Sequence, residues 1–143
     1  MRDILGVYII DNDAKVFFEQ EIYSQGSENI NEAILSRIII TLQKFAEELG
    51  GGNIHKIEIG KNQVFILGDE LTEYKFILWC NQKIKQKMAQ NVLGEIKNIF
   101  IDTFMGQYHK DQEKLIKLKS KFSDKISKLF EKPKDVSGFL KKI

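Results

Sequence analysis

The sequence predicts an α+β fold in three layers, with one β-sheet packed between α-helices. Residues 4–11, 63–69 and 74–81 are apolar at consecutive positions, which is typical of strands covered on both faces. Residues 29–49 and 84–105 repeat apolar side chains at the three-and-four spacing of an amphipathic helix. Because the buried strands need cover on both sides, helices are expected on both faces of the sheet.

The first two strands are predicted to form a hairpin. Residues 4–11, "ILGVYIID", are followed by the turn residues of "DNDA". Residues 15–23 then alternate, with Val16 and Phe18 on one side of the strand and Glu19 on the other. This alternation predicts an edge strand that is exposed on one face.

The first helix is expected over residues 29–49. Asn29 followed by Glu32 has the spacing of a capping box, and Ser27 is an alternative cap. Gly50 ends the helix as a left-handed cap residue. The predicted inward face consists of Ile34, Leu35, Ile38, Leu42, Phe45 and Leu49.

Three strands follow, at residues 54–59, 63–69 and 74–81, joined by the short links "GKN" and "ELTE". They are expected to complete a five-stranded sheet.

Two further helices are predicted near the C-terminal end, over residues 84–105 and 109–131. Gly106 ends the first of them, and Pro133 prevents easy continuation of the second. The expected inward residues are Met88, Val92, Ile96, Ile99, Phe100 and Thr103 on the first, and Leu115, Leu118, Phe122, Ile126 and Leu129 on the second.

The glycines of "ELGGGNIHKIEIGKNQ", residues 48–63, raise the question of a phosphate-binding loop. Such a loop runs from a strand through glycines into a helix, so that the positive helix end meets the phosphate. Here a helix ends, glycines follow and a strand begins, so the negative helix end lies nearest. Gly60 and Lys61 are followed by Asn62 instead of Ser or Thr. We interpret the glycines as the connection between a helix and the following strand.

No other pattern predicts catalysis. Cys80 with His55 or His109 is a conceivable nucleophile and base, but a cysteine in "FILWCNQ" is typical of a small buried hydrophobe. Asp11 and Asp13 are explained by turn preference. Two histidines and one cysteine are too few for a structural zinc site. We therefore predict no enzyme and no catalytic, cofactor-binding or metal-binding residue.

Charge is distributed unevenly along the chain. Residues 1–80 carry seven Lys/Arg and thirteen Asp/Glu, and residues 81–143 carry fifteen and seven. A basic C-terminal half suggests solvated helix faces, an anionic partner or membrane, or contacts between copies. No apolar run approaches the roughly 20 residues of a membrane span. The single cysteine fits a reducing compartment, so a cytoplasmic location is expected.

The element order resembles the longin domain, a profilin-like fold, and the related roadblock domains. The resemblance is carried by "ILGVYIIDNDAKVFFEQEI", by "INEAILSRIIITLQKFAEELGG" and by "EIKNIFIDTF". It covers residues 1–107, which we expect to form one longin-like domain, whereas the basic helix and tail of residues 108–143 depart from short family members. It implies the strand order 2-1-5-4-3, with one helix on one face of the sheet and two on the other.

The resemblance also implies a function. Longin and roadblock proteins are adaptors and GTPase regulators in vesicle-trafficking machinery, and they bind through surfaces without catalytic residues of their own. The implied partner is a small GTPase or another longin/roadblock-type protein, in a homo- or heterodimer, and no nucleic acid. The alternative is a ligand-sensing domain of the PAS/GAF type, which would need an internal pocket.

Two apolar residues break the helical patterns and point to a partner surface. Ile40 is expected on the outer face of the first helix, and Ile101 on that of the second. The uncovered edge strand at residues 54–59 offers unpaired amides and carbonyls beside them. The candidate partner-binding residues are Ile40, Arg37, Lys44, His55, Lys56 and Ile101.

The third helix allows two interpretations. Its apolar stripe can pack on the domain, or its lysines can contact an anionic membrane peripherally. From residue 108 to the end, eleven lysines stand against five acids, and each lysine near such a membrane contributes on the order of 1 kcal/mol.

Overall fold

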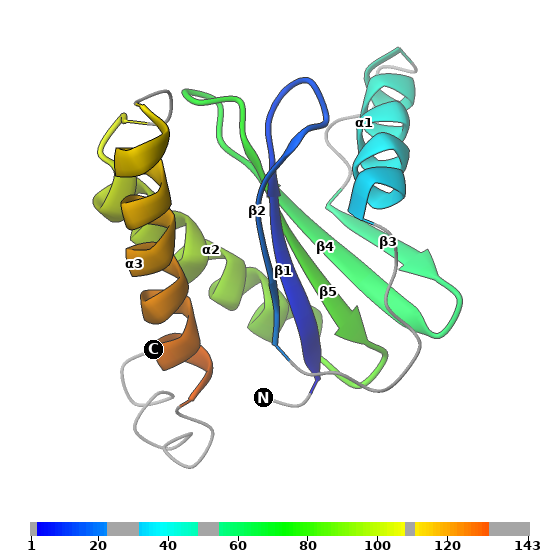
Figure 1. Ribbon diagram of the computed structural model, residues 1–143. Coiled ribbons are helices and arrows are strands. Elements are labelled where there is room, and N and C mark those ends of the chain that lie inside the picture. The colour runs from blue at the N-terminus through cyan, green and yellow to red at the C-terminus, as the bar shows by residue number, and fades with distance from the viewer. Residues whose placement is uncertain (1–2, 23–31, 49–54, 108–110, 132–143) are drawn as a thin grey trace. The chain divides into compact units, whose positions relative to one another are not determined.

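The computed structural model describes residues 3–22, 32–48, 55–107 and 111–131. The chain divides into two compact units, residues 2–94 and residues 95–143. In chain order the elements are β1 (Ile4–Ile10), β2 (Val16–Glu21), α1 (Glu32–Glu48), β3 (Lys56–Ile59), β4 (Asn62–Gly68), β5 (Lys75–Asn81), α2 (Gln86–Phe104) and α3 (Gln112–Phe130) (Figure 1).

The sheet belongs to the first unit and has the order β2-β1-β5-β4-β3, with antiparallel pairing between all neighbours. The predicted strand order is therefore confirmed, and the fold is α+β with a longin/roadblock-like layout. β5 is the central strand, β1 and β4 flank it, and every residue of β1 is buried. The consecutive apolar positions in these strands arise because both of their faces are covered.

Tight turns connect the strands in the way the sequence predicts. The Oδ1 atom of Asp11 accepts hydrogen bonds from the backbone N–H groups of Asp13 and Lys15, at 2.8 and 2.9 Å. The side chain of Asp11 thus has the turn-forming role that the sequence predicts. Between β3 and β4 a two-residue turn begins at Gly60, whose φ of +60° is a left-handed conformation that glycine adopts without steric cost.

One face of the sheet packs against α1 (Figure 1). Leu35 and Ile39 are the buried residues that α1 contributes, and Val16, Ile40 and Ile57 pack against the cluster while partly buried. The cluster consists of Leu5, Tyr8, Ile10, Leu35, Ile39, Val64, Ile66, Ile77 and Trp79.

The predicted inward face of α1 is partly wrong. Ile34 is 54% exposed, whereas Ile40, expected on the outer face, is partly buried against the core cluster. The buried positions are centred on Leu35, Ile39 and Gln43 instead. The run of three isoleucines at residues 38–40 spans more than half a helical turn, so spacing alone cannot choose the buried side.

The opposite face of the sheet is also buried. The first part of α2, residues 86–94, lies on this side in Figure 1 and buries Ala89, Val92 and Leu93. The strand residues on this face are Ile4, Val7, Ile9, Phe65, Phe76, Leu78 and Cys80, each with no measurable exposure.

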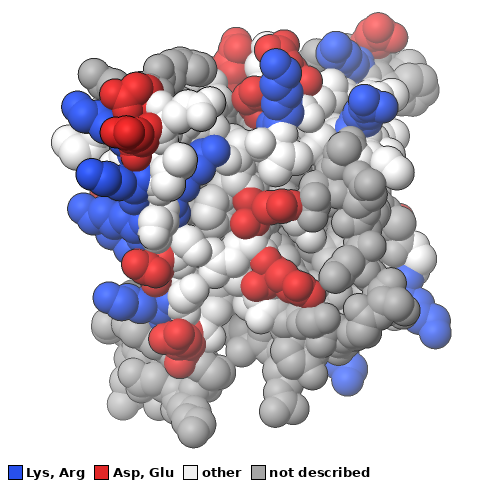
Figure 2. All heavy atoms as spheres, in the orientation of Figure 1, with Lys and Arg blue, Asp and Glu red and all other residues white. Residues whose placement is uncertain are grey.

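The second unit contains the rest of α2 and α3, and it has an aromatic centre. Phe122 of α3 lies edge-on to Phe100 of α2, with ring centroids 5.7 Å apart and planes at 84°. Phe104 completes the group at 4.8 Å from Phe100 and 5.7 Å from Phe122. Basic side chains gather over α3 on the left of Figure 2.

The ends of both helices follow local sequence signals. Gly106, with φ +83°, follows the last turn of α2, so the predicted break is confirmed. The Oδ1 atom of Asp111 accepts from the backbone N–H of Lys114 at 3.0 Å and caps α3. The predicted caps at Ser27, Asn29 and Gly50, the break at Pro133 and the candidate base His109 lie outside the described residues.

Candidate interaction surface

β3 forms one edge of the sheet and pairs only with β4 among the described strands. The backbone N–H of Ile66 donates to the carbonyl of His55 at 2.9 Å, which fixes the hydrogen-bonding register. Because bonded positions alternate along an antiparallel ladder, the backbone amides of Lys56 and Glu58 point away from β4. No other described strand pairs with these groups, and unpaired groups of this kind suit the addition of a further strand.

The side chains at this edge carry opposite charges. Lys56 Nζ lies 3.5 Å from Glu58 Oε1, and the two side chains are 34% and 73% exposed. An exposed pair of this kind contributes little to stability. Its consequence is a charge-balanced edge, in contrast to β2, where the exposed Glu19 and Glu21 lie on one face of the strand.

The outer surface of α1 forms a ridge of exposed side chains at helical spacing: Ile34, Arg37, Thr41, Lys44 and Glu48. Arg37 and Lys44 are thus exposed, as predicted. Ile40 is not on this ridge, and Ile34 occupies the apolar position that sequence reasoning assigned to Ile40. Ile34, Thr41 and Glu48 are seven residues apart, which is about two helical turns, so they lie on one side of the helix. This spacing is the sequence signal that identifies the ridge.

Ile101 belongs to the second unit and is 39% exposed. Met105, the residue directly after α2, is 77% exposed. Both side chains therefore lie on the outer surface of their own unit, and the role of Ile101 in partner binding stays a prediction.

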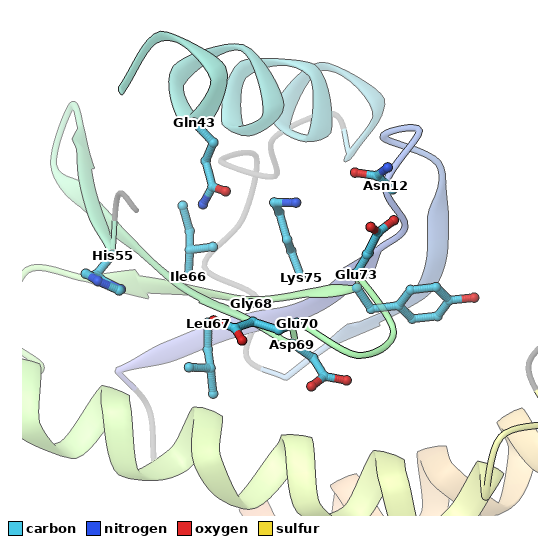
Figure 3. A pocket seen from close by; sticks show the side chains of 11 residues that line it. Asn12, Gln43, His55, Ile66, Leu67, Gly68, Asp69, Glu70, Glu73 and Lys75 are labelled. Atoms are coloured by element: carbon cyan, nitrogen blue, oxygen red, sulfur yellow. The ribbon is translucent and has the colours of Figure 1, made fainter. Parts of the chain in front are cut away.

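A cavity of about 340 Å³ lies in the first unit near one end of the sheet. Figure 3 shows Gln43 pointing from α1 toward the sheet, while Glu73 and Lys75 point from the sheet side toward α1. Asn12 comes from the β1–β2 turn, and His55 is the residue before β3. Sequence reasoning predicted only His55, because the other residues come from segments that are distant in sequence and carry no common motif.

The cavity's chemistry does not resemble that of a typical apolar ligand pocket. Aliphatic side chains in its lining come only from Ile66 and Leu67, and the remainder is mostly polar. Asp69 is already engaged, since its Oδ2 accepts from the hydroxyl and the backbone N–H of Thr72, at 2.6 and 3.3 Å. The hydrogen bonds of Asp69 hold the loop between β4 and β5 in place. The polar lining of the cavity does not favour the PAS/GAF alternative.

Cys80 is fully buried, and burial raises the pKa of its thiol well above the ordinary value of 9.0, with the charge of Asp3 adding to the effect. A protonated, inaccessible thiol is a poor nucleophile. His55 is exposed and directly precedes β3, which is not a neighbour of β5 in the sheet. Across residues 3–22, 32–48, 55–107 and 111–131, no three His, Cys, Asp or Glu side chains are grouped as a metal site would require.

Within the described part of the chain, no helix has the combination of length and apolar character that crossing a bilayer requires.

No family model and no curated protein matches the sequence. Among solved structures, MglB of Myxococcus xanthus is similar, with 11% identity and a TM-score of 0.44 over 90% of this chain and 84% of that chain. A structure described as MglB with tetrameric arrangement has 10% identity and a TM-score of 0.45 over 66% and 72%. A Roadblock/LC7 domain from Streptomyces avermitilis has 13% identity and a TM-score of 0.44 over 65% and 75%.

Proposed function

We propose that this chain is a non-enzymatic interaction module that binds a protein partner by strand addition at the outer edge of β3. The observation that carries the proposal is the edge of the described sheet at β3, where the amides of Lys56 and Glu58 point away from β4 and pair with no other described strand. Strand addition supplies affinity through backbone hydrogen bonds, and the side chains beside them supply specificity.

A second copy of the chain fits this edge. If two β3 strands pair antiparallel about Ile57, Lys56 lies opposite Glu58 of the partner subunit, and the reverse holds on the other side of the axis. The positions that face each other are those whose amides point outward. Opposite charges directly across a strand pair stabilise it by roughly 0.2–1 kcal/mol each, so the register is favoured by both backbone and side chains.

The other edge of the sheet is less suited to this pairing. β2 presents Glu19 and Glu21 as exposed side chains on one face. Two copies of β2 would bring like charges together, which is one way in which edge strands avoid association. This difference favours β3 as the dimer edge.

A small GTPase is the second partner class, because the longin/roadblock resemblance implies GTPase regulation or an adaptor role in trafficking-like assemblies. We place this contact on the α1 ridge, where Ile34 supplies an exposed apolar position at one end, one turn before the exposed Arg37. A pull-down against the small GTPases of the same cell, in both nucleotide states, tests it. Retention that depends on nucleotide supports regulation, equal retention supports a structural adaptor, and no retention contradicts this contact.

The strand-addition proposal is tested by the variant Glu58→Pro. Proline removes an N–H that points away from β4, so the β3–β4 ladder keeps its bonds. We expect the wild-type chain to sediment with twice its 16.6 kDa mass and the variant with the mass of one chain. Glu58→Ala is the matched control, because it removes the side chain and keeps the amide. Equal masses for the wild type and Glu58→Pro would contradict the proposal.

A further inference from the structure

Five lysines of α3 form one straight stripe. Lys114, Lys117, Lys121, Lys125 and Lys128 are spaced by 3, 4, 4 and 3 residues. At 3.6 residues per turn this spacing confines them to an arc of about 80° around the helix, over a length of about 21 Å. A flat charged surface can therefore approach the four exposed members, Lys114, Lys117, Lys121 and Lys128, at once.

The ammonium groups of this lysine stripe are largely uncompensated. Lys125 donates to the hydroxyl of Thr103 at 3.2 Å, whereas the other four make no ion pair within the described residues, and all four are exposed. The apolar residues Phe122, Ile126 and Phe130 face the interior of the unit, beside the stripe.

The acids of α3 lie along one flank of the lysine stripe. They are Glu113 and Asp124, joined by the C-cap residue Glu131, and their helical positions fall just outside the arc of the lysines. They reduce the positive field on that flank and leave the opposite side of the stripe bordered by apolar residues. The stripe therefore keeps a net positive surface.

The residue types favour a bilayer over a folded protein as the partner. Residues 95–143 contain no arginine, and the stripe contains no aromatic residue. Protein interfaces are enriched in arginine, tyrosine and tryptophan and depleted in lysine, because arginine forms directed, bidentate bonds. Lysine is a compact, strongly hydrated charge, which suits the diffuse field of a lipid headgroup layer.

From this geometry we propose that the lysine stripe of α3 holds the protein peripherally on an anionic phospholipid surface. The contact is electrostatic, without insertion of a helix into the hydrocarbon layer. It is separate from the β3 edge, so each proposal can fail without the other.

Binding of the full chain to vesicles of phosphatidylcholine and phosphatidylserine in equal amounts, measured by co-sedimentation at low salt, tests the proposal. The triple variant Lys114→Gln, Lys117→Gln, Lys121→Gln is expected to bind about a hundredfold more weakly. Lys61→Gln, Lys83→Gln, Lys87→Gln is the matched control, since it removes the same charge from exposed positions outside the stripe. Circular dichroism of both variants confirms that each is folded.

A single substitution in the opposite direction sharpens the test. Asp124 lies three residues after Lys121 and four before Lys128, so it is a neighbour of both on the helix surface. Asp124→Asn is expected to bind the same vesicles several-fold more tightly. Absence of binding to the anionic vesicles, equal loss in the stripe and control variants, or equal binding to pure phosphatidylcholine would overturn the proposal. Stripe-dependent binding to random duplex DNA that is tighter than binding to the vesicles would assign the stripe to nucleic acid and overturn it as well.

Discussion

The Nζ atom of Lys125 on α3 donates a hydrogen bond to the Oγ1 atom of Thr103 on α2, over a distance of 3.2 Å. Thr103 is buried, whereas Lys125 is half-buried, so the bond joins the interior of the second unit to its basic surface. The same lysine therefore contributes to the packing of two helices and to the stripe proposed above.

Removing this bond is expected to lower the free energy of unfolding by about 1 kcal/mol, the usual net value of such a bond. The variants Thr103→Val and Lys125→Met, together with the double variant, form a double-mutant cycle that isolates the pairwise contribution. Urea unfolding followed by circular dichroism measures it. A coupling energy indistinguishable from zero would show that the contact does not stabilise the helix pair.

Phe122 is expected to be the most sensitive position of the second unit. It is fully buried and contacts the rings of Phe100 and Phe104. Phe122→Ala leaves a cavity and should lower the free energy of unfolding by about 3–5 kcal/mol. Ser120→Ala, at an exposed position of the same helix, is the control and should change it by less than about 0.5 kcal/mol. Similar stabilities for the two variants would disprove this packing.

Cys80 predicts a specific dependence of stability on pH. Because burial raises the pKa of the folded thiol, only the unfolded chain loses this proton as the pH rises above about 9. The contribution of this thiol to the free energy of unfolding is therefore fully present below pH 9. Above pH 9 the contribution declines by about 1.4 kcal/mol per pH unit. Urea unfolding of the wild type and of Cys80→Ala between pH 7 and about 11 measures this decline. The difference between the two free energies of unfolding cancels the contribution of lysines and tyrosines, which both proteins share. A constant difference between the two proteins across this range would contradict the assignment.

The strand order could be anticipated because β1, β4 and β5 are each apolar on both faces and because the element order resembles a known layout. Burial on both sides leaves a strong and local signal in the sequence. The boundaries of the described helices and strands also lie within a few residues of those expected, since glycines and turn residues mark them.

The face of α1 could not be anticipated with the same accuracy. Several apolar residues in succession satisfy more than one inward face, and the choice depends on the shape of the sheet beneath. Leu35 and Ile39 are buried because they pack into the core cluster that contains Tyr8 and Trp79 of the sheet. The cavity near Lys75 was missed for a related reason, since its lining is assembled from distant segments by tertiary packing alone.

The correction at Ile40 changes the experiment that tests the partner surface. Ile40→Asp would place a charge against the core cluster and destabilise the fold, so a loss of binding in that variant would be uninformative. Exposed positions at the β3 edge are free of this difficulty.

The most direct measurement of the central proposal is a charge-reversal experiment at this edge. Lys56→Glu alone, or Glu58→Lys alone, places like charges across both contacts of the pair about Ile57 and should weaken self-association by about 2 kcal/mol, roughly thirtyfold. In a mixture of the two variants each strand again faces opposite charges. Sedimentation equilibrium is expected to show one-chain masses for each variant alone and a two-chain mass for the mixture. A wild-type mass of 16.6 kDa, or a mixture that associates no better than its components, would contradict pairing at β3.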